Sequence, residues 1–135
     1  MSSCLGDDDD KVTGSLLYDG EKYSIHDAKY GHNSFHFSTH GQQEVEVCYL
    51  NFYVPDESKR VELIPGEENF WRIDITLDNL GLSASNTEPG EVGGGEISWQ
   101  RSGYDNFTVS FDIRMKSGKR LQGNCSGKFP VAVVD

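Results

Sequence analysis

Apolar and polar side chains alternate with a period of two along most of the chain beyond residue 11. This period is typical of half-buried β-strands, and no segment has the apolar spacing of a long helix. Gly, Asn, Asp and Ser mark the turns between the apolar runs. The regular stretch at 96–129 predicts a three-stranded meander, and the whole pattern predicts an all-β domain of about eight antiparallel strands.

Three segments depart from simple alternation. Asp19-Gly20 lies between two apolar runs and predicts a tight hairpin, because glycine accepts positive φ without strain. The run 44–54 changes its apolar phase midway, so we expect a bent, bulged strand near Cys48. Residues 79–95 are rich in Gly and Ser and are predicted to form a long flexible loop.

Strands joined mostly by hairpins suit two architectures. One is an up-and-down meander that closes into a lipocalin-like barrel, and the other is a two-sheet sandwich. We favour the barrel because closure removes exposed sheet edges. A chain of 135 residues has the usual size of one domain. We therefore assign residues 12–135 to a single β domain and residues 1–11 to a disordered tail.

The charge of the chain narrows the classes of partner. Nucleic-acid binding depends on clustered Lys and Arg, whereas this chain has a formal net charge of −10 and its 12 basic residues are scattered. Anionic membrane surfaces are disfavoured for the same reason. No apolar run approaches the roughly 18 residues that span a bilayer, so we expect membrane contact only through a covalent lipid.

The first ten residues, MSSCLGDDDD, combine small residues before a cysteine with an acidic run. They resemble the mature start of a bacterial lipoprotein, with Met1 standing where a signal peptide was removed. The acidic run is similar to the export signal of surface-exposed lipoproteins in the Bacteroidota. The resemblance implies a lipid on Cys4 and an exported protein anchored at the outer membrane or cell surface.

Two other interpretations of the acidic run stay open. The sequence DDDDK at 7–11 matches an enterokinase-type cleavage site, which would be the product of engineering. Four consecutive aspartates could also attract calcium, although they lack the spaced ligands and the turn of a calcium loop.

The meander carries a second resemblance. The segments GEISW at 95–99, YDNFTVSF at 104–111 and SGKRLQGNCSG at 117–127 are similar to the closing part of many uncharacterised Bacteroidota lipoproteins. This resemblance implies a fold and a cellular location, but it identifies no catalytic residue. The present chain has Cys125 where an aromatic or small residue is usual.

Two cysteines lie inside well-patterned strands. Cys48 and Cys125 could form one disulfide in an oxidising compartment, or they could be two buried thiols that act as small hydrophobic side chains. Their spacing does not decide between these alternatives.

All four histidines fall between His26 and His40. His32, His36 and His40 are candidate ligands for zinc, copper or nickel, because alternate strand positions can present imidazoles to one ion. However, His36 and His40 would lie about 13 Å apart along an extended strand. The alternative is that both belong to the polar face of an amphipathic strand.

The sequence favours a non-enzymatic binding or accessory module with no cofactor. Paired carboxylates are expected by chance in so acidic a chain, and no nucleophile-elbow sequence is present. The ligand is unknown, and we consider a glycan or a small apolar molecule held in a lipocalin-like barrel. The rival hypothesis is a metal-dependent protein or hydrolase that uses the segment 26–40. Aromatic residues that could form a sugar-stacking platform, or else pack in the core, are Tyr18, Tyr23, Tyr30, Tyr49, Tyr53 and Trp99.

Overall fold

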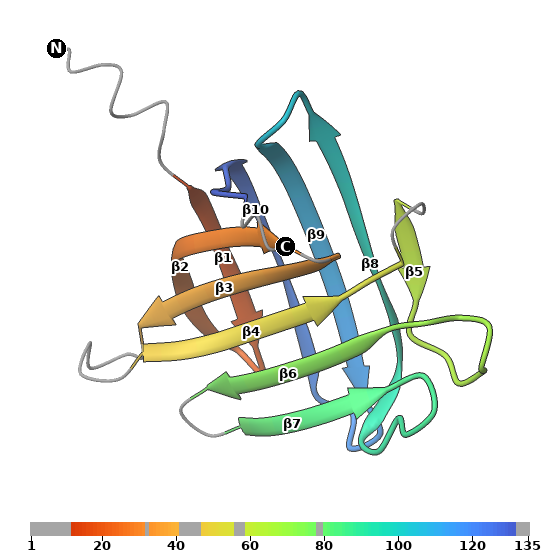
Figure 1. The fold of residues 1–135 in the computed structure, drawn as a ribbon. Helices are drawn as coiled ribbons and strands as arrows, with labels where there is room; N and C mark the ends of the chain where they lie inside the picture. Colours follow the sequence, from red (N-terminus) through yellow and green to blue (C-terminus); the bar gives the residue numbers. More distant parts are fainter. Residues whose placement is uncertain (1–11, 32, 41–46, 56–58, 78–79, 132–135) are drawn as a thin grey trace, which may run out of the picture.

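The computed structural model describes residues 12–31, 33–40, 47–55, 59–77 and 80–131. Within these ranges the chain forms ten strands in one curled antiparallel sheet, and no helix (Figure 1). The all-β prediction is therefore confirmed, with ten strands in place of about eight. No helix in the described ranges is long and apolar enough to cross a membrane.

The strands are β1 Thr13–Tyr18, β2 Glu21–Gly31, β3 Ser34–His40, β4 Val47–Tyr53, β5 Arg60–Glu62, β6 Arg72–Leu77, β7 Leu80–Ser85, β8 Val92–Ser102, β9 Asn106–Met115 and β10 Arg120–Lys128.

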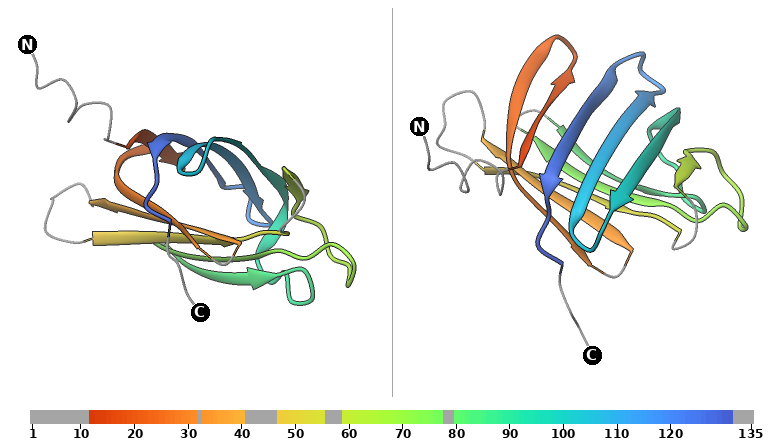
Figure 2. Two further views of the ribbon diagram at one scale, coloured as in Figure 1. Left: turned by 45° about the horizontal axis from the view of Figure 1, so that its top comes forward. Right: turned by 90° about the horizontal axis from the view of Figure 1, so that it is seen from above.

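Neighbours in the sheet follow the order β5-β8-β9-β10-β1-β2-β3-β4-β6-β7. The first strand of the chain pairs with the last, and most other neighbours are consecutive in sequence. The β8-β9-β10 meander is present as predicted. The sheet curls so that β8, β9, β10 and β1 form one half and β3, β4, β6 and β7 form the other, with the two halves facing each other (Figure 2).

β2 makes the turn from one half to the other. Its first residues pair with β1 and its later residues pair with β3. Between these parts the register shifts, and His26 is the extra residue between the pairs Ile25–Thr39 and Asp27–Ser38. A bulge of this kind bends a strand and increases its twist, which accounts for the curl.

The β1–β2 hairpin forms where the sequence predicts it. Asp19 and Gly20 have φ values of 51° and 90°. Two consecutive positive φ angles are the requirement of the tight hairpin turn whose twist matches that of the flanking strands.

Aromatic side chains fill the space between the two halves. Phe37 on β3 lies 6.1 Å from Phe111 on β9, and Phe52 on β4 lies 5.0 Å from Phe111, measured between ring centroids. Phe35 contacts Phe107 in an edge-to-face arrangement at 5.6 Å. The rings that make up this phenylalanine cluster are Phe35, Phe37, Phe52, Phe107, Phe111 and Phe129.

The prediction of a bulged strand near Cys48 is wrong for the described part of that run. β4 pairs with β3 and β6 without a register shift. Cys48 and Leu50 are buried, whereas Tyr49 is 51% exposed. Tyr49 contributes to the apparent change of phase, because tyrosine counts as apolar in the pattern although its hydroxyl favours water.

The prediction of a flexible loop at 79–95 is also wrong. The segment contains β7 and the first residues of β8. Its run of glycines belongs to a bulge in β8, where the register with β9 shifts between Val92 and Gly94. Gly95 has a φ of 128°, and a Cβ atom there would overlap the carbonyl oxygen of Asp112. These glycines serve close strand packing.

We predict that Gly95→Ala destabilises the fold by about 2–4 kcal/mol, because alanine is strained at this φ and its methyl group would separate β8 from β9. Chemical denaturation measures the change. Gly81→Ala is the matched control: it lies on β7 with no atom within 4 Å of the new methyl group, so we expect a change within about 0.5 kcal/mol. Equal stabilities for the two variants would refute the packing argument.

Candidate functional site

Three rows of residues run across the outward side of β3, β4, β6 and β7 and the end of β2, and within them Gly31 and Ser34 are buried. We call this surface the tyrosine face. Its rows, each in order from β2 to β7, are Asp27, Ser38, Tyr49, Thr76, Gly81, then Lys29, His36, Asn51, Asp74, Ser83, then Gly31, Ser34, Tyr53, Arg72, Ser85.

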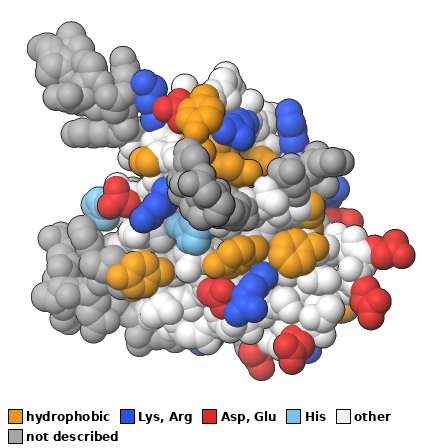
Figure 3. Space-filling view, in the orientation of Figure 1, with side chains coloured by type: hydrophobic (Ala, Val, Ile, Leu, Met, Phe, Trp, Pro, Cys, Tyr) orange, Lys and Arg blue, Asp and Glu red, His pale blue; other side chains and the backbone are white. Residues whose placement is uncertain are grey.

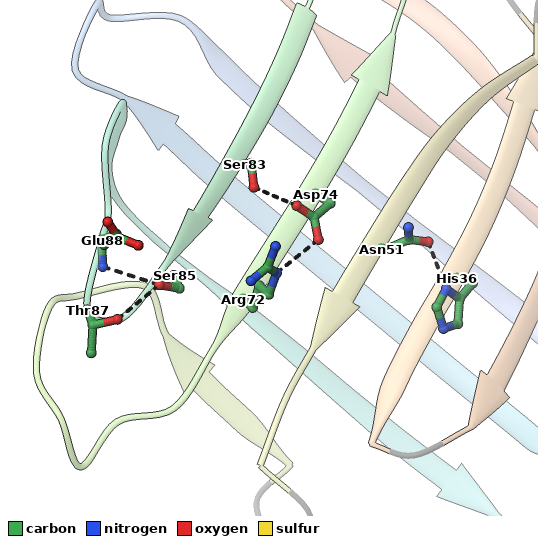
Figure 4. A network of polar contacts seen from close by, with 8 residues as sticks. All are labelled: His36, Asn51, Arg72, Asp74, Ser83, Ser85, Thr87 and Glu88. Carbon is green, nitrogen blue, oxygen red and sulfur yellow. Dashed lines mark hydrogen bonds and ion pairs between the residues drawn. The ribbon is translucent and has the colours of Figure 1, made fainter. Parts of the chain in front are cut away.

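The middle row is joined by hydrogen bonds at its β3–β4 end. Figure 4 shows the contact between His36 and Asn51, in which His36 Nδ1 lies 2.8 Å from Asn51 Oδ1. His36 Nε2 lies 2.9 Å from the hydroxyl of Ser34. The same hydroxyl donates to the carbonyl of Gly31. The imidazole also meets the Tyr53 ring edge to face, with 6.0 Å between centroids. Both ring nitrogens are therefore engaged, and the orientation of His36 is fixed.

The β6–β7 end of the middle row is organised by Asp74. The hydroxyl of Ser83 donates to its Oδ1 at 2.7 Å, and Arg72 Nε donates to its Oδ2 at 3.1 Å (Figure 4). Partial burial opposes ionisation of Asp74, but the hydrogen bonds from Ser83 and Arg72 and the charge of Arg72 outweigh it and lower the pKa of the carboxyl. Asp74 is thus a carboxylate held in one orientation.

Aromatic side chains lie on both sides of the middle row. Tyr49 is 51% exposed and Tyr53 is half-buried. Hydrophobic side chains form a line across this face of the molecule, with a histidine, an acid and a base beside them (Figure 3). The other aromatic candidates lie elsewhere: Tyr18, Tyr23 and Trp99 are buried, and Tyr30 packs against the core.

Sequence reasoning did not select Asn51, Arg72, Asp74 or Ser83. Asn51 is the single amide in an otherwise apolar run, and alternation alone puts Arg72 and Asp74 on one side of their strand. The meeting of Asn51 with Asp74 depends on the pairing of β4 with β6, which passes over β5. No local pattern reveals that pairing.

The three histidines proposed as metal ligands are only partly described. His32 lies outside the described residues, and so does the side chain of His40, which ends β3. His36 and His40 are four residues apart on a strand paired continuously with β4, so their Cα atoms are separated by about 13 Å. The described residues contain no group of three His, Cys, Asp or Glu that could hold a metal ion. The metal site stays a prediction.

Of the predicted cysteine sites, Cys48 and Cys125 are buried thiols and no disulfide joins them. They belong to opposite halves of the sheet, on β4 and β10. Burial raises the pKa of the Cys125 thiol to about 12, which keeps it protonated and unreactive at neutral pH. Cys4 lies outside the described residues.

A second group of titratable residues lies where β2 bends. His26 lines a hollow of about 720 Å³ together with Asp27, Asp105 and Lys128. The described residues that line it include no serine, threonine or cysteine. That lining therefore lacks the hydroxyl and thiol nucleophiles that serine, threonine and cysteine hydrolases use.

We predict that Ser83→Ala raises the pKa of Asp74 toward its ordinary value, because one of the hydrogen bonds that lower it is lost. With a lowered pKa, ionised Asp74 stabilises the fold above the ordinary carboxyl pKa, and this contribution is lost as the pH falls through the folded-state pKa. In the variant the folded-state pKa of Asp74 lies closer to the ordinary value, so this stabilising contribution is smaller and is lost at a higher pH than in the parent protein. A ¹³C NMR titration of the Asp74 carboxyl measures the shift, with Thr76→Ala, exposed on the same strand, as control. Identical midpoints in both variants would disprove the role of Ser83.

Comparison with known proteins leaves the tyrosine face as the basis for assigning a function. No protein-family model, curated protein or solved structure matches the chain. The geometry of this face therefore carries the functional proposal: a hydrogen-bonded middle row, with one tyrosine on each side of it, on neighbouring paired strands.

Proposed function

We propose that the protein is a non-enzymatic carbohydrate-binding module and that the tyrosine face is its ligand surface. The observation that carries this proposal is the middle row from His36 to Ser83 with Tyr49 and Tyr53 beside it. Sugar rings combine apolar C–H faces with hydroxyl edges. Tyrosine rings can stack on the C–H faces, and amide, imidazole and carboxylate groups in fixed positions can hydrogen-bond to the hydroxyl edges.

The fixed orientation of the polar groups favours binding. Asn51, Asp74 and His36 are each held by a neighbouring side chain, so ligand binding immobilises little that was mobile before. These side chains also project from strands, which are more rigid than loops and therefore position binding groups more accurately.

The phenylalanine cluster argues against the alternative of a lipocalin-like carrier. A carrier needs an apolar cavity inside its barrel. Here Phe37, Phe52 and Phe111 pack against one another across the interior, at ring distances of 5.0–6.1 Å. Surface binding is therefore the better-supported function.

We expect retardation of the protein in affinity gel electrophoresis with at least one neutral polysaccharide from a panel of glucans, mannans, xylans and galactans. Tyr49→Ala should weaken binding about tenfold, since one aromatic contact contributes about 1.4 kcal/mol. Tyr104→Ala removes another tyrosine, 64% exposed in the β8–β9 turn, and should bind like the parent.

Two outcomes would overturn the proposed function. One is the absence of retardation by every polysaccharide in the panel. The other is a loss of binding in Tyr104→Ala with none in Tyr49→Ala, which would move the ligand to a different surface.

We further propose that the module acts at a bacterial cell surface or in the periplasm, anchored by a lipid on Cys4. The resemblance of residues 1–10 to the start of a lipoprotein supports this. A form expressed behind a lipoprotein signal segment should fractionate with membranes, and Cys4→Ala should release it into the soluble fraction. Equal membrane association of both forms would rule out the anchor.

A further inference from the structure

Tyr49 and Tyr53 leave the same strand on the same side and are four residues apart. At the usual rise per residue their Cα atoms lie about 13 Å from each other. Asn51 stands between them on the same side of β4, in register with His36 on β3 and Asp74 on β6. The order along β4 is thus aromatic, polar, aromatic.

The polar groups between the two tyrosines present fixed hydrogen-bonding atoms. Asn51 contacts His36 through one polar atom of its side-chain amide, and the other polar atom has no hydrogen-bond partner among the described residues. Each oxygen of Asp74 accepts one hydrogen bond, from Ser83 or from Arg72, and a carboxylate oxygen can accept a second. The second polar atom of the Asn51 amide and the remaining acceptor positions of Asp74 are therefore available side by side.

Charge on the tyrosine face points to an uncharged ligand. Its two acidic residues, Asp27 and Asp74, are matched by two basic ones, Lys29 and Arg72. The whole chain has a formal net charge of −10. An anionic ligand would be repelled by the chain as a whole, and a cationic ligand would find stronger attraction elsewhere on the surface.

Pairing within the sheet disfavours a peptide strand as the occupant. Peptides that bind sheets usually add to an edge, where backbone groups are unpaired. β3, β4 and β6 each have neighbours on both sides. An extended peptide lying on this face would leave its own backbone groups without partners from the strands.

We infer that the ligand is an uncharged linear oligosaccharide that lies along β4, stacks on Tyr49 and on Tyr53, and hydrogen-bonds to Asn51 and Asp74 between them. This inference rests on the proposed function and adds the ligand class and its placement. A chain must be several sugar units long to contact both rings, so affinity depends on ligand length.

Calorimetric titration with cello-, manno- and malto-oligosaccharides, from the monosaccharide to the hexasaccharide, tests the inference. In the series whose polymer retards the parent protein, we expect affinity to rise about tenfold once the chain contacts both tyrosines, and then to stay level. Tyr49→Ala should bind long chains with the affinity that the parent shows for short ones. Tyr104→Ala should keep the full dependence on length.

The outcomes separate the two proposals. Equal affinity for short and long chains in the parent would overturn the bridging geometry while leaving glycan binding intact. Preference for polygalacturonate fragments, or for a peptide, would overturn the uncharged-glycan class. Failure of every series and of every neutral polymer would overturn the proposed function itself. Tyr53→Ala must also lose the higher affinity for long oligosaccharides. Its melting temperature shows whether this variant is folded.

Discussion

Contacts among six phenylalanine rings join the two halves of the curled sheet, and the rest of the structure depends on them. Phe35, Phe37 and Phe52 come from one half, and Phe107, Phe111 and Phe129 come from β9 and the residue after β10. All are buried, and each buried aromatic side chain stabilises the fold by about 1.5–3 kcal/mol. Because these rings fill the space between the two halves, the proposed ligand surface is on the outside of the sheet.

The curl of the sheet decides which side chains meet on those faces. The bulge at His26 lets β2 leave β1 and pair with β3, which brings β3, β4, β6 and β7 together as one half. Continuous register across these strands aligns His36, Asn51, Asp74 and Ser83 in one row. The proposed ligand surface is therefore a product of strand order and register, and no single motif contains it.

Features that depend on a few neighbouring residues were predictable from the sequence. Asp19-Gly20 made the expected turn, and alternation identified the buried side chains of the meander, from Ile97 to Phe129. Residue type alone gave wrong predictions for residues that suit more than one environment. Tyr49 was counted as apolar but lies outside, and Gly95 was assigned to a flexible loop although it permits close contact with Asp112. The alignment of Asn51 with Asp74 needs the pairing of β4 with β6, which passes over β5 and for which the sequence has no local signal.

The central claim is that ligands meet the outside of β4 and its neighbours while the interior stays closed. A two-dimensional NMR titration of the parent protein with a neutral hexasaccharide that binds it tests this most directly. The account predicts shifts in the side-chain amide of Asn51 and the rings of Tyr49 and Tyr53, with the phenylalanine cluster unchanged. Shifts concentrated in Phe37, Phe52 and Phe111, or around the hollow beside His26, would contradict it.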